Sequence, residues 1–320
     1  MHQVRRAGCF THRLAGLTLI ALFQSSAPAF AQAWAPPAGT GAVTFFYQWI
    51  DNTGHLGTDG LLIPAGQSTN LGLYVEAEYA FTDRLSVTAG LPFVLAKYTD
   101  PLPGPPPIPY LPNEQCHCWN SGWQDVGFTA RYNIVNGAFA LTPFVSIGMP
   151  SHDYDFRGEA AIGYALREVR LGVSAGRRLD TVSPRLSVQG RYSYAIVEQV
   201  LGIPNNRSNA SFDGGYAVTR RFSARGMISW QRTHGGLRFG ADPPFEVVFP
   251  GEVNTPERLF QHDRLLRDNN LHAGASAAYA FPRMDLFGSY IEYISGTDSH
   301  AGRVFTMGVS WPFEISRKRP

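Results

Sequence analysis

The chain has 320 residues, of which 16% are charged and 13% aromatic, and it contains 33 glycines. Residues 1–31 are expected to be removed; they carry three arginines and no acidic residue, so the net charge falls from +2 to about −1. Without these residues the chain has no excess of basic residues, so its charge gives no indication of a nucleic-acid partner. Few charges, many aromatics and almost no helical periodicity favour a β-barrel whose outside faces lipid.

The first residues follow the order of a secretory signal peptide. Arginines come first, then the apolar run 14–23, then small residues that end at Ala31. The apolar run is about half of the ~20 residues that a membrane-spanning helix needs, which disfavours an N-terminal anchor. We expect cleavage after Ala31, with Ala33 as a second candidate, and a single domain over 32–320.

Twelve segments show the period-two alternation of β-strands. They are residues 41–52, 68–81, 85–99, 122–134, 138–150, 166–179, 185–199, 208–219, 222–234, 268–281, 285–296 and 302–313. Strand boundaries are weak in sequence, so counts of ten or fourteen also fit. The pattern predicts an all-β, antiparallel transmembrane barrel of about twelve strands.

The connections between these segments alternate in length. The tight ones are 82–84, 135–137, 180–184, 220–221 and 282–284; the longer ones are 53–67, 100–121, 151–165, 200–207, 235–267 and the shorter 297–301. Outer-membrane barrels have short turns on the periplasmic rim and long loops outside. With an even strand count, both termini are expected in the periplasm, and loop 235–267 is long enough to fold into the mouth.

The last segment shows why the outer surface of the barrel is expected to face lipid. Its large apolar side chains fall on one face and its small or polar ones on the other, the apolar set being Phe305, Met307, Val309, Trp311 and Phe313. A soluble β-sandwich also alternates, but its exposed face is rich in Lys and Glu. Here the only lysines are Lys97 and Lys318. The bacterial outer membrane is therefore the predicted location.

Charged side chains fall on the expected lumen face of several strands. The pore candidates are Glu76, Glu78, Asp125, Arg131, Arg185, Arg191 and Arg225, and Arg170, Asp213 and Glu292 are also expected to point inward. One interpretation is that these charges pair and fill the lumen. The other is a constricted, water-lined pore whose charges set solute selectivity. Asp125 also fits a capping role at a strand opening.

Loop 100–121 has seven prolines between 101 and 112, a density that favours a stiff polyproline II spacer. Cys116, His117 and Cys118 follow. They are weak metal candidates, because zinc sites normally have four ligands at wider spacing. A disulfide or intermolecular pairing is favoured in an oxidising compartment. Most of the histidines in or beside the long connections, a group that includes His55 and His300, are expected to be solvated, and no cofactor is expected.

An enzymatic role is not expected. Barrel lipid hydrolases need a serine activated by a histidine at the outer rim. No histidine stands two positions before a serine, and the adjacent pairs Ser151–His152 and Ser299–His300 alternate to opposite faces of a strand. The short stretch before the first strand also leaves no N-terminal domain to plug the barrel.

Two resemblances add to this interpretation. Thr306, Gly308, Trp311 and Phe313 resemble the C-terminal insertion signal of outer-membrane barrels, which implies recognition by the barrel-insertion machinery. Segments 78–93 and 122–132 resemble the strand–turn–strand unit and the Gly-x-x-Asp-x-Gly strand opening of the outer-membrane family associated with meta-pathway phenol degradation. That family resemblance implies a barrel that takes up aromatic or other apolar compounds.

The sequence thus predicts an outer-membrane channel for passive uptake of small solutes, with outer-membrane lipid, the insertion machinery and the solute as partners. The alternative is a structural or adhesive barrel with a filled lumen, whose loops are the working surface.

Overall fold

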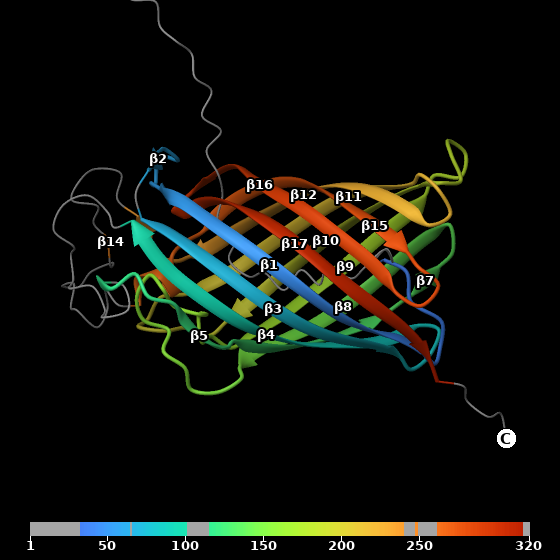
Figure 1. Cartoon of the computed structure of the whole chain (residues 1–320), viewed down its shortest axis with the longest axis horizontal. Helices are drawn as coiled ribbons and strands as arrows, with labels where there is room; N and C mark the ends of the chain where they lie inside the picture. The colour runs from blue at the N-terminus through green and yellow to red at the C-terminus, as the bar shows by residue number, and fades with distance from the viewer. Residues whose placement is uncertain (1–32, 65, 101–114, 240–246, 249–260, 316–320) are drawn as a thin grey trace, which may run out of the picture.

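The computed structural model describes residues 33–64, 66–100, 115–239, 247–248 and 261–315, and these form one closed antiparallel β-barrel (Figure 1). The expected signal peptide 1–31, the proline run and most of loop 235–267 lie outside the described residues. No helix in the described part of the chain is long and apolar enough to cross a membrane.

Twelve strands make up the barrel wall, as the alternation predicts. They are β1 (Thr40–Leu56), β3 (Gln67–Ala80), β4 (Leu85–Asp100), β6 (Asp125–Tyr132), β8 (Phe139–Pro150), β9 (Glu168–Arg178), β10 (Leu186–Val197), β11 (Asn205–Ala217), β12 (Phe222–Gly235), β15 (Asn269–Ala280), β16 (Asp285–Thr297) and β17 (Ser299–Glu314). Short additions are β2 (Leu62–Ile63), β5 (Asn120–Trp123), β7 (Val135–Asn136), the hairpin β13 (Arg238–Phe239) and β14 (Val247–Val248), and the helix α3 (His262–Leu265).

The barrel closes because the first strand pairs with the last. Figure 1 shows β1 in blue beside β17 in red, and their register runs from Thr40 opposite Glu314 to Leu56 opposite Ser299. Thr44 and Ser310 add a side-chain hydrogen bond of 2.9 Å across this pair. Closure leaves no open edge among the twelve strands of the wall, which is what a membrane requires of a β-structure.

Several strand boundaries differ from the sequence expectation, and two of the differences change the topology. The predicted segment 122–134 is interrupted at Gln124, which separates β5 from β6. Both strands pair with β4, but the β5–β6 side has one residue more than β4 across the interruption, as in a β-bulge. Pro92, opposite this break, has no N–H, and its carbonyl accepts from the Gln124 backbone N–H at 2.9 Å. The expected loop 297–301 is absent, since only Asp298 separates β16 from β17.

The outward faces are apolar, as expected for a lipid-facing surface. Large exposed side chains alternate along the strands, among them Phe45, Leu73, Phe128, Tyr192, Ile228, Met307 and Trp311. The expectation that Glu292 in β16 points inward is wrong. Leu286, Tyr290 and Ile294 are exposed, whereas Phe287 is buried. Glu292 shares the outward parity of Tyr290 and accepts its hydroxyl at 3.2 Å, so Glu292 does not line the lumen.

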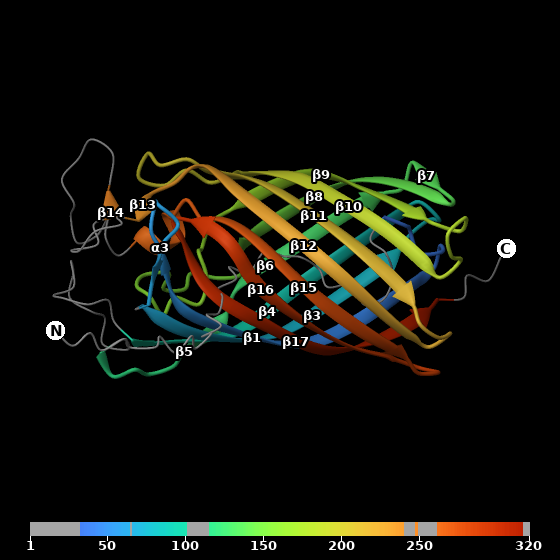
Figure 2. The same cartoon turned by 90° about the horizontal axis from the view of Figure 1, so that it is seen from above.

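This architecture is that of a bacterial outer-membrane barrel. Below, the terminus end is the rim where β1 begins and β17 ends, and the long-loop end is the opposite rim; both are visible in Figures 1 and 2.

Candidate functional site

The terminus end of the lumen is entered by the residues that precede β1. Ala33 is fully buried, and its carbonyl accepts hydrogen bonds from Thr142 Oγ1 at 2.6 Å and Asn133 Nδ2 at 3.0 Å. The Ala33 N–H donates to Gln189 Oε1 at 3.1 Å. Trp34 donates its indole N–H to the Gly137 carbonyl at 2.8 Å. We call residues 33–38 the N-terminal segment; it is held inside the barrel by inward-facing polar side chains.

A cavity of about 760 Å³ adjoins the N-terminal segment. Its lining comes from the segment, from the ends of β1 and β17, and from the lumen charges Glu78 and Arg131. The segment therefore fills part of the lumen and leaves solute-sized space beside it. Sequence reasoning did not predict this short insertion, because no local pattern signals it.

Several of the charged lumen candidates form ion pairs with each other. Arg131 donates to Glu78, and Arg225 Nη1 lies 2.8 Å from Asp213 Oδ1. The other oxygen of Asp213 accepts from Gln189 Nε2 at 2.8 Å. Because Gln189 also holds Ala33, the charge network and the N-terminal segment are connected. This arrangement matches the expectation that the charges pair and rigidify the lumen.

A second cluster was only partly expected. Glu168 accepts from Arg170 Nη2 at 2.7 Å and from Arg207 Nη2, so one carboxylate joins β9 to β11. Arg191, a pore candidate, places its guanidinium carbon 3.8 Å from the centre of the Phe144 ring. Arg207 was missed because β11 begins at Asn205, whereas the predicted segment began at residue 208. Glu168 has the same parity as the inward candidate Arg170, which could have identified it.

The remaining pore candidates are not all in the lumen. Glu76 is buried beside Gly90, where an added Cβ would lie 3.2 Å from Glu76 Cγ. Arg185 is exposed in the turn before β10 and donates to the Val218 carbonyl at 3.2 Å. The expectation that Arg185 narrows the lumen is therefore wrong, because its strand begins one residue later than predicted.

The long-loop end is covered by residues 151–167, which fold over the inner face of β4. Tyr154 and Ile162 pack with Val94 and Ala96 in a buried cluster. The Tyr154 hydroxyl donates to Asp125 and accepts from the Ala165 N–H at 2.8 Å. Burial, followed by the nearby Asp125 charge, keeps the pKa of Tyr154 above its ordinary value. Asp125 therefore holds this loop at the opening of β6.

Helix α3 covers the same end from the other side (Figure 2). Arg264 donates to the Tyr164 carbonyl at 3.2 Å, and its guanidinium carbon lies 3.7 Å from the centre of the Phe156 ring. Asn205 Nδ2 donates to the Arg264 carbonyl at 3.0 Å. The helix and the loop 151–167 thus contact each other across the mouth. A small cavity of about 100 Å³ remains beneath them.

A buried carboxyl fixes the chain where it enters β15. Asp268 accepts from Asn270 Nδ2 at 3.0 Å, from Gln231 Nε2 at 2.7 Å and from the Ser299 hydroxyl. Burial raises the pKa of Asp268, and these hydrogen bonds oppose the shift. The carboxyl connects β12, β15 and β17 at the long-loop end.

Cys116 and Cys118 form a disulfide. This excludes them as thiolate metal ligands in this state, and His117 Nδ1 lies 3.1 Å from the Tyr98 carbonyl oxygen. Trp119 and Trp123 are nearly half exposed on the outside, as expected of an interfacial girdle.

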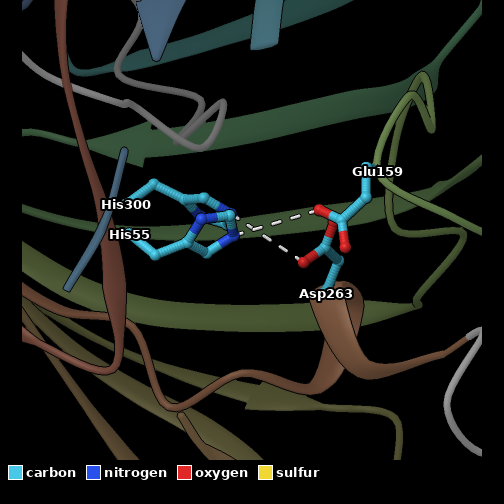
Figure 3. A group of neighbouring side chains, drawn as sticks. All are labelled: His55, Glu159, Asp263 and His300. Carbon is cyan, nitrogen blue, oxygen red and sulfur yellow. Dashed lines mark ion pairs between the residues drawn. The ribbon is translucent and has the colours of Figure 1, made fainter. Parts of the chain in front are cut away.

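His55 and His300 contradict the expectation that the histidines near the long connections are solvated. Both are buried, with exposed fractions of 1% and 9%. β1 continues to Leu56 and β17 begins at Ser299, so both side chains belong to the barrel wall. They face Glu159 and Asp263 across the lumen (Figure 3).

Comparison with known proteins identifies the fold but does not identify a family. No family model matches the chain, and no curated protein matches it. Among solved structures, the chain is similar to the COG4313 outer membrane channel from Pseudomonas putida F1, with a TM-score of 0.66 and 14% identity over 89% of this chain and 99% of that one.

Two further structures are more distant. The TodX ΔS2S3 mutant monoaromatic hydrocarbon channel has a TM-score of 0.42 and 10% identity over 90% of this chain and 93% of that one. The KdgM porin has a TM-score of 0.43 and 9% identity over 85% of this chain and 99% of that one. The first comparison supports the outer-membrane barrel fold, and the resemblance to the phenol-degradation family stays a prediction.

Proposed function

We propose that the chain is an outer-membrane channel for passive uptake of small solutes. The observation that carries this proposal is the cavity of about 760 Å³ beside the N-terminal segment of a closed barrel. Four side-chain hydrogen bonds hold Ala33 and Trp34 there. A segment held this way is able to shift without unfolding the barrel.

Aromatic or other apolar compounds are the proposed solutes. This part of the proposal rests on the resemblance of segments 78–93 and 122–132 to the phenol-degradation family. The cavity wall agrees with it, because Trp34, Pro36, Pro37 and Phe313 supply an apolar surface beside the Glu78–Arg131 pair.

The competing function is a structural barrel with a filled lumen. The paired charges Glu78–Arg131 and Asp213–Arg225 and the covered long-loop end favour it. The two functions differ in one measurable respect, since a filled barrel passes no solute.

Single-channel recording in planar bilayers separates them. We expect small conductance steps from the wild type and larger or longer openings from Trp34→Ala, which removes the indole contact with Gly137. Trp230→Ala, on the lipid-facing side of β12, is the matched control and should leave conductance unchanged. Absence of conductance in the wild type and in Trp34→Ala would favour the structural role. Liposome swelling with phenol-sized and sugar-sized solutes then tests the solute class.

A further inference from the structure

Two histidines and two carboxylates meet at the long-loop end of the lumen. His55 and His300 lie opposite each other in the β1–β17 pairing, Glu159 belongs to the loop 151–167, and Asp263 to α3. One nitrogen or oxygen atom from each residue lies within 4.8 Å of the others. Figure 3 shows the four side chains pointing toward a common centre.

The separations fit an ion between the groups better than direct contact. His55 Nε2 is 3.9 Å from Glu159 Oε2, and His300 Nε2 is 3.8 Å from Asp263 Oδ1. Both distances exceed a hydrogen bond of about 2.7–3.2 Å. In a tetrahedral zinc site with bonds of about 2.0–2.1 Å, neighbouring ligand atoms are about 3.3–3.4 Å apart. Coordination distance would therefore require a contraction of about half an ångström in these two pairs, and of up to about 1.4 Å for atoms at the widest separation of 4.8 Å.

The chemistry of the donors selects the ion. Imidazole nitrogens suit zinc and other late first-row divalent metals, whereas calcium and magnesium prefer all-oxygen sites. The carboxylates of Glu159 and Asp263 together balance the charge of a divalent ion. With neutral histidines, the occupied site therefore has no net charge. We propose that His55, Glu159, Asp263 and His300 form a binding site for a divalent transition metal, most simply Zn²⁺.

The surrounding residues hold the ligands in place. Gly66, at φ +75°, packs directly against the His55 ring, where an added Cβ would lie 2.2 Å from Cε1 and Nδ1. Next to Asp263, the side chain of Arg264 joins α3 to the loop 151–167 through the Tyr164 carbonyl. Two ligands thus come from the rigid barrel wall, and two come from segments that already contact each other over the lumen.

The site has a mechanical consequence that rests on the proposed channel function. A bound metal would fasten both covering segments to the β1–β17 wall directly above the small cavity, which is lined by Asp263, Arg264, Glu159 and His300. Metal binding is therefore expected to stabilise the closed long-loop end and to lower conductance when Zn²⁺ is added on that side.

Isothermal titration calorimetry with ZnCl₂ tests the site on the full mature protein in detergent, after chelator treatment. We expect one Zn²⁺ per barrel, and a weakening of at least about 100-fold in His300→Gln and tenfold or more in Glu159→Gln. His152→Gln and Asp155→Asn, an exposed histidine and an exposed carboxylate in the same loop as Glu159, should bind as the wild type does. Cys116→Ser/Cys118→Ser should also leave binding unchanged.

Co²⁺ provides a second readout, because its visible absorption reports four-coordinate nitrogen and oxygen ligation. Glu159 lies in a loop outside the barrel strands, so Glu159→Gln is expected to leave the barrel wall that carries His55 and His300 folded. Lack of stoichiometric Zn²⁺ binding, or wild-type binding in both Glu159→Gln and Asp263→Asn, would overturn the site. Binding without any change in conductance of a conducting protein would overturn the fastening of the loops. A protein that binds Zn²⁺ and never conducts would retain the site and lose the channel function.

Discussion

The Ala33 carbonyl lies inside the barrel and accepts a hydrogen bond from Thr142 Oγ1 at 2.6 Å. Thr142 in turn accepts from Asn133 Nδ2 at 2.7 Å, so one hydroxyl joins the N-terminal segment to two positions of the barrel interior. All three residues are almost completely buried. A buried hydroxyl in this position determines how firmly the segment is held.

Thr142→Val should loosen the N-terminal segment. Valine keeps the shape of threonine but leaves the Ala33 carbonyl and the Asn133 amide each with one hydrogen bond fewer. At about 1–3 kcal/mol for the lost bond to the Ala33 carbonyl, the population of displaced segment should rise about 5- to 160-fold. Longer open times in planar bilayers would show this. Thr129→Val is the control, because its hydroxyl contacts Ser146 on the neighbouring strand and not the segment. Equal open times in both variants would contradict the prediction.

Arg131→Gln should make the lumen more cation-selective. The change leaves the Glu78 carboxylate without its partner guanidinium and leaves Glu76 nearby. The reversal potential in a KCl gradient should shift in the direction of cation selectivity. Arg283→Gln, in the exposed turn between β15 and β16, removes the same charge outside the lumen and should leave the reversal potential unchanged.

Gly308→Ala should impair assembly of the last strand. An added Cβ would lie 2.5 Å from Phe287 Cζ, 2.5 Å from Phe46 Cβ and 2.7 Å from the Phe45 carbonyl. Neither ring is able to yield far, because Phe46 also stacks on Tyr74. We expect less folded protein in outer-membrane fractions, measured by heat-modifiable gel mobility.

Gly226→Ala is the matched control for Gly308→Ala. Gly226 lies in a strand with no heavy atom within 4 Å of an added Cβ, so alanine should fold at wild-type level. Similar losses in both variants would show that the effect of Gly308→Ala is not steric.

Asp268→Asn should change how stability depends on pH. Burial raises the folded-state pKa of Asp268 above its unfolded value, so the folded protein binds more protons between the two pKa values. Stability should therefore fall as pH rises through this window, and Asp268→Asn should flatten the slope. Urea unfolding in liposomes across this pH range measures the difference. An unchanged slope would mean that Asp268 does not titrate there.

The barrel could be predicted from the sequence because the alternation of apolar and polar residues is visible within most single strands. In the last strand, every second residue from Phe305 to Phe313 is large and apolar, and this alternation alone predicts which side faces lipid. It failed in 285–296, where Phe287 is apolar but points inward, with its ring centre 6.4 Å from that of Phe46. Apolar residues on both faces leave the parity undetermined.

The site residues were harder to predict because they are assembled from distant positions. Glu78 and Arg131 belong to different strands and were found only because each lies on the polar face of its own strand. His55, Glu159, Asp263 and His300 have no common spacing, and two of them belong to segments without a repeating pattern. Only the folding of both segments into the lumen brings them together.

Because β1 pairs with β17, the barrel closes only when β17 is present. A polypeptide that stops before residue 299 leaves β1 and β16 each with an open edge, and in lipid every unsatisfied backbone group costs several kcal/mol. Such a product has no stable place in the bilayer and stays exposed to periplasmic proteases. The final sixteen residues of the barrel thereby distinguish finished chains from unfinished ones.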